Sequence, residues 1–414
     1  MYTIIINWFR SIISRIWFML RRIEASCIPS ARGGPVVAWR NVVQIKLDFD
    51  VSPIYQTYLT PTYPLSIFGA HGDTRAILAT YYINFCLPKG KVVGTSRDGA
   101  AISPWISAKD FSRLGYFRCR EWRFGDSLRA DPAVIPWITT SLIDGWYPYA
   151  HVDEYYIPGT SPYKKRGFRH PALVVGWSGR SKIFNIITYL SNGSYGETAV
   201  HCNDLALAIY SSGGWDKSGG ADGLSLYCVK PEAVKNPFNI YTSMAHISNY
   251  ISSRENCEID GIEKSPAAEN TNAQYQAIHK GNDLLYGLDA FNAFGSYILR
   301  VMDANLPIDL RDTRALWEHK KIIFLNLLFW AEYAGNIESS IRSNYDVVVK
   351  WAHVLHLLSF DYNLSYHKNT TALRQHIGKL TAIVEIERGI LERILRLLHV
   401  SVQLRRNDGG GRSR

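Results

Sequence analysis

The chain has 414 residues, which is long enough for two domains. Of these residues 47% are hydrophobic and 20% are charged, a composition that excludes a disordered chain and a multi-span membrane protein. The net charge of +10 lies mainly at the ends: residues 1–40 carry six Arg against one Glu, and residues 400–414 carry four Arg against one Asp. Because the body of the chain is nearly neutral, we expect no nucleic-acid-binding groove.

The first 22 residues, MYTIIINWFRSIISRIWFMLRR, predict a basic amphipathic helix. Arg15 interrupts the apolar run before it reaches the roughly 20 residues that a membrane span requires. Two interpretations of this extension, residues 1–40, stay open: an anchor on a membrane surface, or a helix that packs on the protein or precedes the native start. We expect a cytoplasmic protein, with peripheral membrane contact through residues 1–22 under the first interpretation.

Residues 41–234 predict a domain of mixed strands and helices. Three short runs rich in β-branched and aromatic residues, WYPYAHVDEYYIP, HPALVVGW and KIFNIITYL, are typical of successive strands joined by Gly, Ser and Asn turns. One helix is expected after Asp73, through RAILATYYINF, and another after Asn203 and Asp204, through LALAIYS.

Residues 235–404 predict a domain of long helices. The first follows Asn236 and Pro237, and the others are expected near 286–303, 310–334, 340–360 and 370–404. The last has apolar residues every three or four positions, so one of its faces must be buried; these are Leu373, Ile377, Leu380, Val384, Leu391, Ile394 and Leu398. Residues 405–414 are predicted to be a disordered tail.

His170 is the best candidate for a functional histidine. It begins the strand HPALVVGW, whose apolar run fixes the backbone, and Gly176 allows close strand packing or a bulge. A histidine that acts as a general base needs an acid or amide on its far nitrogen, and Asp153 on the preceding strand is a candidate for that role. A structural role for His170, and an exposed or capping Asp153, are the competing explanations.

Three sequence blocks resemble a known family. They are Val152-Asp153-Glu154-Tyr155-Tyr156-Ile157-Pro158 with Tyr163-Lys164-Lys165, then His170 to Trp177, and in the helical part Asp309-Leu310-Arg311 with Leu316-Trp317-Glu318-His319-Lys320-Lys321. Together they resemble the papain-like domain of butirosin biosynthesis protein H, in a longer branch encoded beside peptide-synthetase genes of bacilli. The resemblance covers residues 41–404.

The resemblance implies an α+β fold: a papain-like, cysteine-protease-like antiparallel sheet with helices in residues 41–234, followed by an all-α domain. It also implies chemistry by a Cys, a His and an Asp or Asn, which in the butirosin case moves an aminoacyl group from a carrier protein to an aminoglycoside. His170 corresponds to the family's histidine. Where the family has its acid, this chain has Ile187 and Thr188 with Asn185 nearby.

The nucleophile is the second departure from the family pattern. The six cysteines contain no CxxC pair, which favours reduced thiols and predicts no metal site or cofactor. A reactive cysteine belongs at a helix N-terminus, where the helix dipole favours the thiolate. Cys27 in the extension can begin a helix, whereas Cys86 is expected where a helix ends, and each is also explained as a buried apolar residue.

The remaining candidates are binding residues. Tyr155, Tyr156, Trp177 and Asn185 are expected to contact a substrate near His170. In the helical part, Glu318 and His319 are adjacent and project about 100° apart on a helix, so they cannot chelate a metal together. We expect Trp317 to pack into the core and Glu318 to pair with Lys321 outside it.

Three functional hypotheses follow. The first is an accessory protein of peptide or aminoglycoside antibiotic biosynthesis that binds a thioester on an acyl or peptidyl carrier protein, or its acceptor, and is catalytically degenerate. The second is a working acyltransferase or thioesterase that uses His170 with a further nucleophile. The third is a peptidase-like maturation factor. A thiol near His170 would favour the second hypothesis.

Overall fold

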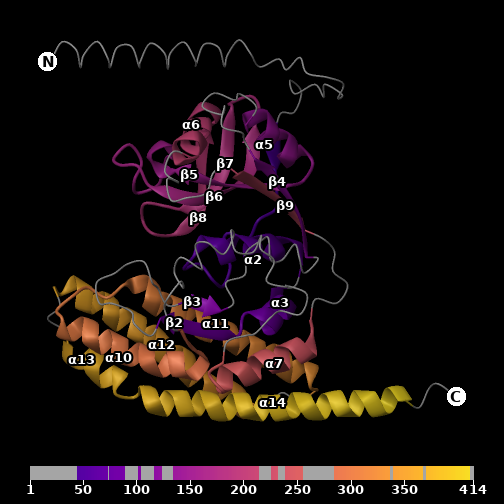
Figure 1. Ribbon diagram of the computed structural model, residues 1–414, viewed down its shortest axis with the longest axis vertical. Coiled ribbons are helices and arrows are strands. Elements are labelled where there is room, and N and C mark those ends of the chain that lie inside the picture. The colour runs from indigo at the N-terminus through magenta and orange to yellow at the C-terminus, as the bar shows by residue number, and fades with distance from the viewer. Residues whose placement is uncertain are drawn as a thin grey trace. The chain divides into compact units, whose positions relative to one another are not determined.

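The computed structural model (Figure 1) describes residues 44–72, 74–88, 101–103, 116–123, 134–213, 225–231, 238–254, 284–335, 339–366 and 370–410. They belong to two compact units: unit 1 draws on Met1–Val51 and Arg118–Lys230, and unit 2 on Ser52–Phe117 and Pro231–Arg414. The units differ from the predicted domains because residues 52–117 join the helical unit. The predicted amphipathic extension lies outside the described residues.

Unit 1 is built on an antiparallel sheet with the strand order β4-β9-β5-β6-β7-β8, and β1 also pairs with β6. The three predicted strands are confirmed as β5 (Tyr147–Asp153), β6 (Arg169–Ser178) and β7 (Ile183–Tyr189). The other strands are β1 (Gln44–Lys46), β4 (Phe117–Arg123), β8 (Tyr195–His201) and β9 (Ser225–Pro231). The register between β6 and β7 shifts between Val174 and Gly176, as the glycine predicts. A Cβ at Gly176 would lie 3.0 Å from the Ile45 carbonyl oxygen.

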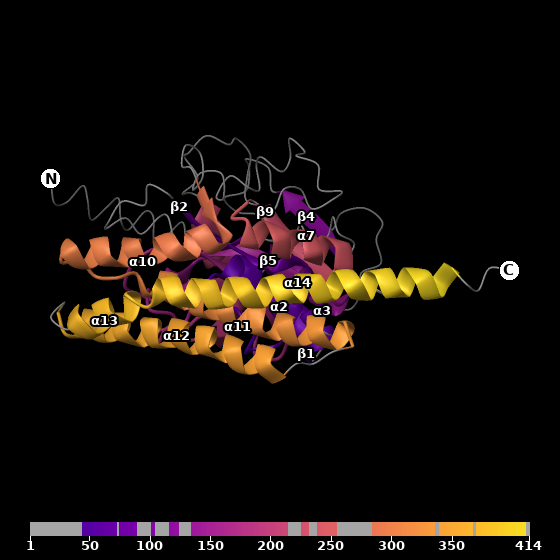
Figure 2. The same cartoon turned by 90° about the horizontal axis from the view of Figure 1, so that it is seen from below.

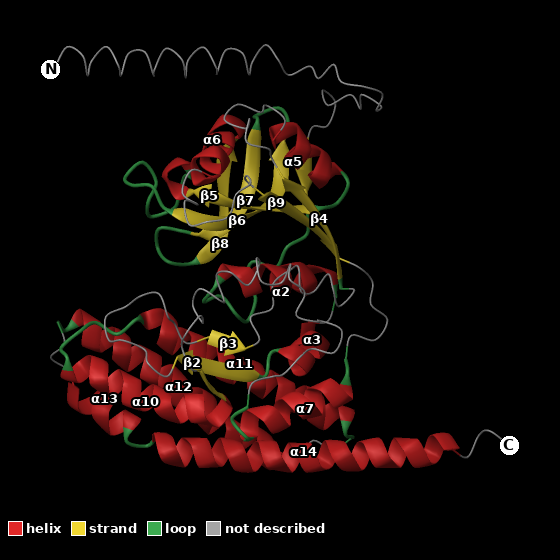
Figure 3. Ribbon diagram, viewed as in Figure 1, coloured by secondary structure: helices red, strands yellow, loops and turns green. Residues whose placement is uncertain are grey.

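Two helices cover one face of this sheet, α5 (Val134–Ile143) and α6 (Cys202–Gly213), as Figure 3 shows. Val134, Ile138 and Leu142 of α5, and Leu205, Ala208 and Ile209 of α6, pack in one core with Val152, Ala172, Val174 and Ile186 of the sheet. Since successive strand residues alternate between faces, His170 belongs to the same face as Ala172 and Val174.

Unit 2 consists mainly of helices, and Figure 2 shows the long ones side by side. They are α2 (Leu59–His71), α3 (Thr74–Tyr81), α7 (Ile240–Ile251), α10 (Gly287–Asp303), α11 (Leu310–Tyr333), α12 (Ser339–Leu364), α13 (Thr370–Ile377) and α14 (Leu380–Gly410). The predicted helices near 286–303, 310–334 and 340–360 are confirmed. The predicted helix 370–404 is divided at Gly378, a residue with low helix propensity.

A small antiparallel sheet also belongs to unit 2, in the order β10-β2-β3: β10 is Leu284–Tyr286, β2 is Asn84–Pro88 and β3 is Ala101–Ser103. The helix predicted after Asp73 therefore ends early. The side chain of Asn84 accepts from the backbone N–H groups of Phe85 and Gly287, each at 2.9 Å, and donates to the Arg254 carbonyl at 2.9 Å. These tertiary bonds hold the segment out of a helix.

The C-terminal end differs from the predicted disordered tail, because α14 extends to Gly410. Arg405 fixes this part of the helix: its guanidinium donates to the Tyr333 carbonyl at 2.8 Å and lies 4.0 Å from the centroid of the Tyr333 ring. Among the helices in the described ranges, none combines the length and the apolar character needed to cross a bilayer.

Candidate functional site

His170 lies at the start of β6, and its imidazole contacts a buried carboxylate. Nδ1 of His170 is 2.7 Å from Oε1 of Glu154, whose side chain is only 4% exposed. The hydroxyl of Thr188 on β7 donates to the same oxygen at 3.3 Å. An ionised Glu154 accepts the proton on Nδ1, which leaves the lone pair on Nε2. The pair therefore presents a basic nitrogen in a fixed orientation.

Glu154, rather than the predicted Asp153, is the carboxylate that contacts His170. Asp153 is the N-cap of the 3₁₀ turn Glu154–Tyr156. Its Oδ1 accepts from the backbone N–H of Tyr155 at 3.0 Å and from that of Phe168 at 2.9 Å. These two bonds join both ends of the loop between β5 and β6, so Asp153 positions Glu154 and His170 without touching the imidazole.

The His170 ring is flanked by aromatic side chains but is not enclosed. Its centroid is 5.5 Å from that of Phe168 and 5.4 Å from that of Tyr189. The side chain is 22% exposed, and none of the described residues hydrogen-bonds Nε2. A polar group on a ligand can therefore reach this nitrogen from outside.

Two of the four predicted binding residues lie on the same loop as Glu154. Tyr155 and Tyr156 pack edge to face with centroids 5.0 Å apart, and the ammonium of Lys164 lies 5.2 Å and 5.3 Å from their rings. Lys164 has a positive φ of 54°, an uncommon conformation that the loop supports by a bond from its N–H to the Tyr155 carbonyl at 3.0 Å. This loop, which joins Glu154 to His170, therefore supplies aromatic surface and the ammonium of Lys164.

The other two predicted binding residues, Trp177 and Asn185, lie far from His170. Trp177 is seven residues further along β6, about 23 Å at the rise of a strand, and Asn185 lies on β7 beside Gly176. Trp177 packs on Phe184 with a centroid distance of 4.4 Å, and the Asn185 amide donates to Glu197 at 2.6 Å. Both side chains stabilise the opposite end of the sheet.

The cysteines of the described residues do not complete a thiol-imidazole pair. Cys202 begins α6, and a helix N-terminus favours a thiolate. However, β8 ends beside Ile183 of β7, which pairs with Ser178 of β6. Ser178 is eight residues from His170 along β6, or about 26 Å. The last turn of α6 confirms this direction, because the Ser212 hydroxyl donates to the His151 carbonyl at 2.7 Å, near the His170 end of the sheet.

The remaining thiols of the described residues are no better placed. Cys228 pairs with Pro148 of β5, which is four residues from Val152, and Val152 is the residue opposite His170. Burial raises the pKa of the Cys228 thiol to about 12. Cys119 lies on β4, beyond β9 in the strand order. Cys86 is 1% exposed within β2 of unit 2, in a strand rather than at a helix end. Cys27 lies outside the described residues.

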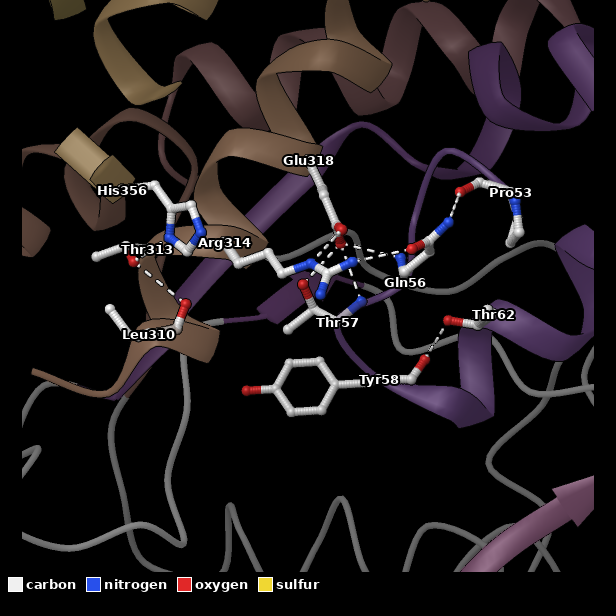
Figure 4. Close-up of polar contacts among 10 residues, drawn as sticks. All are labelled: Pro53, Gln56, Thr57, Tyr58, Thr62, Leu310, Thr313, Arg314, Glu318 and His356. Atoms are coloured by element: carbon white, nitrogen blue, oxygen red, sulfur yellow. Dashed lines mark hydrogen bonds and ion pairs between the residues drawn. The ribbon is translucent and has the colours of Figure 1, made fainter. Parts of the chain in front are cut away.

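A second polar cluster lies in unit 2 and was not predicted. Glu318 is 2% exposed and accepts four hydrogen bonds (Figure 4). Its Oε2 receives the backbone N–H groups of Gln56 at 3.0 Å and Thr57 at 2.9 Å and the Thr57 hydroxyl at 2.6 Å. Its Oε1 receives Nε of Arg314 at 2.8 Å. This carboxylate ties the segment that begins unit 2 to α11.

The neighbouring residues of α11 agree with the expected arrangement only in part. Trp317 is half-buried and packs against the core of unit 2, as expected. It also stacks on His353 with centroids 4.4 Å apart, and Lys321 lies over its indole at 4.2 Å. Lys320 instead is fully buried: its ammonium is 2.7 Å from Glu387 of α14 and donates to the Tyr250 hydroxyl at 2.6 Å. The expected outer pair of Glu318 and Lys321 is therefore wrong, because Glu318 lies inside and pairs with Arg314.

The polar groups of unit 2 carry out structural roles rather than present reactive atoms. Burial lowers the pKa of Lys320 to about 8, although Glu387 opposes the shift. Burial also lowers the pKa of His319 well below its usual value, and Nε2 of this ring contacts the Ile83 carbonyl at 2.8 Å. Because Lys320 and His319 are fully buried and Glu318 is only 2% exposed, the Glu154–His170 pair, whose imidazole is 22% exposed, is the stronger candidate site.

Comparison of the chain with family models and with curated proteins gave no match. The functional argument therefore depends on the geometry of the site and on the chemistry of its residues.

Proposed function

We propose that unit 1 binds an acyl or peptidyl thioester carried on a carrier protein, or the amine that accepts the acyl group, and that it serves peptide or aminoglycoside biosynthesis without a cysteine nucleophile. The antiparallel sheet with α5 and α6 on one face is compatible with a papain-like scaffold, which is part of the proposal. The observation that carries it is the 2.7 Å contact between Glu154 and His170, beside which the described residues place no thiol.

The chemistry of the pair suits an amine or a thioester. A neutral imidazole whose Nδ1 is bonded to a carboxylate accepts a hydrogen bond at Nε2 and stabilises a positive charge if it gains the proton. Tyr155, Tyr156 and Lys164 add aromatic surface and a positive charge on the adjoining loop. Such a loop complements an uncharged acyl chain and a phosphate of a pantetheine arm.

Binding of a stable substrate analogue tests the proposal. Isothermal titration calorimetry of the full chain with an aminoacyl-pantetheine amide, which cannot be cleaved, should give a binding signal that His170→Ala and Glu154→Gln each weaken about tenfold, the loss of one charge-assisted hydrogen bond. His201→Ala is the matched control, since this exposed histidine lies at the other end of the sheet. Equal affinity of wild type and both site variants would refute the assignment.

An active acyltransferase is the second candidate, because an imidazole held by a carboxylate can act as a general base. In this reaction the acceptor amine attacks the thioester carbonyl, Nε2 of His170 takes the amine proton, and the departing thiolate recovers a proton from the imidazolium. No protein thiol takes part. Thiol release from an aminoacyl-pantetheine thioester, measured with and without an added amine, distinguishes transfer from binding alone.

A reactive cysteine would contradict both candidates, because neither of them uses a protein thiol. If the chain acts without a thiol, iodoacetamide labels Cys27 at the rate of an ordinary thiol, and Cys27→Ser leaves thiol release unchanged. If Cys27 reacts well below pH 8, and His170→Ala removes that reactivity, the chain uses a cysteine nucleophile after all.

A further inference from the structure

Helix α12 carries an apolar stripe that its own unit leaves exposed. Val347, Val354, Leu357 and Leu364 are 47%, 40%, 51% and 63% exposed, and Phe360 beside them is 48% exposed. Figure 2 shows α12 at the margin of the helical layer, where its opposite face packs on α11, α13 and α14. Four exposed aliphatic side chains on one helix face are unusual for a monomer surface.

The spacing of the stripe is that of a coiled-coil seam. The exposed positions Ser343, Val347, Lys350, Val354, Leu357, Asp361 and Leu364 follow one another at intervals of four and three residues. This is the heptad pattern by which one helix packs along another with knobs in holes. The charged members of the seam, Lys350 and Asp361, carry opposite charges.

The seam is self-complementary in the antiparallel direction. A two-fold axis that passes between residues 355 and 356 places Val354 opposite Leu357, Val347 opposite Leu364, and Lys350 opposite Asp361 of a second copy. Each apolar residue then meets an apolar one and each charge meets its opposite. Because an isologous interface uses every contact twice, the dimer gains two Lys350–Asp361 pairs.

We propose that the protein forms an antiparallel homodimer through α12, with Lys350 and Asp361 as the pair that sets its register. In the single chain Lys350 contacts Asp346, one turn earlier, at 2.5 Å, and its side chain is 73% exposed, so it can also reach a carboxylate across the seam. A charged pair within a mainly apolar seam selects one alignment, because a shift of one heptad places Lys350 opposite Val354 or Asp361 opposite Leu357.

A neighbouring hollow fits the same arrangement. A groove of about 380 Å³ lies between α12 and α14, lined by Ile341, Asn344, Val347, Glu385, Ile386, Gly389, Ile390 and Arg393. The two-fold axis that matches the seam brings the end of the partner's helix to this groove, with Leu364 of the partner subunit opposite Val347. Tyr366 follows that end, is 85% exposed and has a positive φ of 52°, so its ring is available to cover the groove.

Analytical ultracentrifugation of the full chain over a range of concentrations tests the dimer. The wild type should pass from monomer to dimer with rising concentration, and Val354→Glu with Leu357→Glu should abolish the transition. Val400→Glu on α14 is the matched control, because Val400 is an exposed valine outside the seam, at 53% against 40% for Val354. A wild type that stays monomeric throughout, or seam variants that dimerise normally, would overturn the proposal and leave the stripe to another occupant.

Charge exchange tests the alignment independently of folding. Lys350→Glu places like charges together in both pairs, as does Asp361→Lys, so each variant alone should show a dissociation constant raised about tenfold or more. An equimolar mixture of the two variants restores an opposite charge at both pairs and should dimerise as well as the wild type does. If the mixture dimerises no better than either variant alone, the antiparallel pairing is wrong.

Discussion

Removal of either partner from the buried Lys320–Glu387 pair should destabilise unit 2 by unequal amounts. Both side chains are fully buried. Lys320→Met leaves the Glu387 carboxylate with the Tyr345 hydroxyl, at 2.5 Å, but without its counter-ion. An uncompensated buried charge of this kind costs about 3–5 kcal/mol. Glu387→Gln should cost less, about 1–3 kcal/mol, because Gln still accepts from Tyr345 and Lys320 can give up its proton.

The pH dependence of stability should also differ between the wild type and Glu387→Gln. The pKa of Lys320 is lowered to about 8 in the folded chain by burial, against 10.5 when unfolded. Between these values the unfolded chain binds one more proton than the folded chain, so the contribution of Lys320 to stability rises with pH and is constant below pH 8. In Glu387→Gln the opposing carboxylate is absent, and the rise should begin at lower pH. Above pH 10 the raised pKa values of Tyr250 and Tyr345 act in the opposite direction.

Amide hydrogen exchange of α11 and α14 measures the stability that unit 2 loses in Lys320→Met and Glu387→Gln. It can be measured in the full chain, because exchange in these helices reports the opening of unit 2 alone. A loss of 3–5 kcal/mol corresponds to exchange faster by about two to four orders of magnitude. Arg396→Met, which removes an exposed basic side chain from α14, is the control and should change exchange in these helices little. The reasoning fails if Lys320→Met costs under about 1 kcal/mol, or if Glu387→Gln is the more damaging change.

Three further predictions follow. Burial lowers the pKa values of His246, His319, His356 and His376, so below pH 6.5 the unfolded chain binds more protons than the folded chain does. The melting temperature of unit 2, measured by calorimetry, should therefore fall from pH 7 to pH 5, and a constant melting temperature would contradict this assignment. Asp153→Ala should cost about 1–2 kcal/mol and speed amide exchange at Tyr155 and Phe168, whereas Asp153→Asn keeps an acceptor; equal exchange in both would exclude the capping role. Gly287→Ala should cost more than about 2 kcal/mol in urea denaturation, since the new Cβ would lie 2.1 Å from the Tyr250 carbonyl oxygen. Gly335→Ala, also at positive φ but with no atom within 4 Å of the new Cβ, should cost about 1 kcal/mol. Similar losses in the two variants would show that the close contact at Gly287 is relieved by movement.

The sequence predicts those elements whose pattern is long and regular. The helices α10, α11 and α12 agree with their hydrophobic spacing, and the strands β5, β6 and β7 agree with their content of β-branched and aromatic residues. Strand β2 could not be predicted in this way. The apolar run before it continues as a helix by local preference, and only the distant bonds of Asn84 to Arg254 and Gly287 make it a strand.

The sequence predicts only one member of the Glu154–His170 pair. The sequence pattern indicates that His170 lies at the start of a strand. It also predicts that the preceding strand continues through Tyr156, whereas in the structure a 3₁₀ turn begins at Glu154 and directs that carboxylate toward the imidazole. The sequence does contain a signal for the turn, since an Asp at the end of a strand commonly caps the next backbone N–H groups.

The buried network of unit 2 also left a signal that was overlooked. On α14 the apolar positions Leu380, Val384, Leu391 and Ile394 are separated by four, seven and three residues, and Glu387 occupies the missing position between Val384 and Leu391. A carboxylate on an apolar face requires a buried cation, and Lys320 supplies it. Its partner could not be named from the sequence, because the two residues lie on different helices.

The ¹⁵N resonances of the His170 ring test the central claim most directly. In the full chain, identified by their loss in His170→Ala, they should show a proton on Nδ1 and none on Nε2, and the Nε2 signal should shift when an aminoacyl-pantetheine amide is added while the His201 signals stay unchanged. A ligand that binds without moving the His170 signals, or a ring protonated on Nε2 with Glu154 intact, would contradict the account.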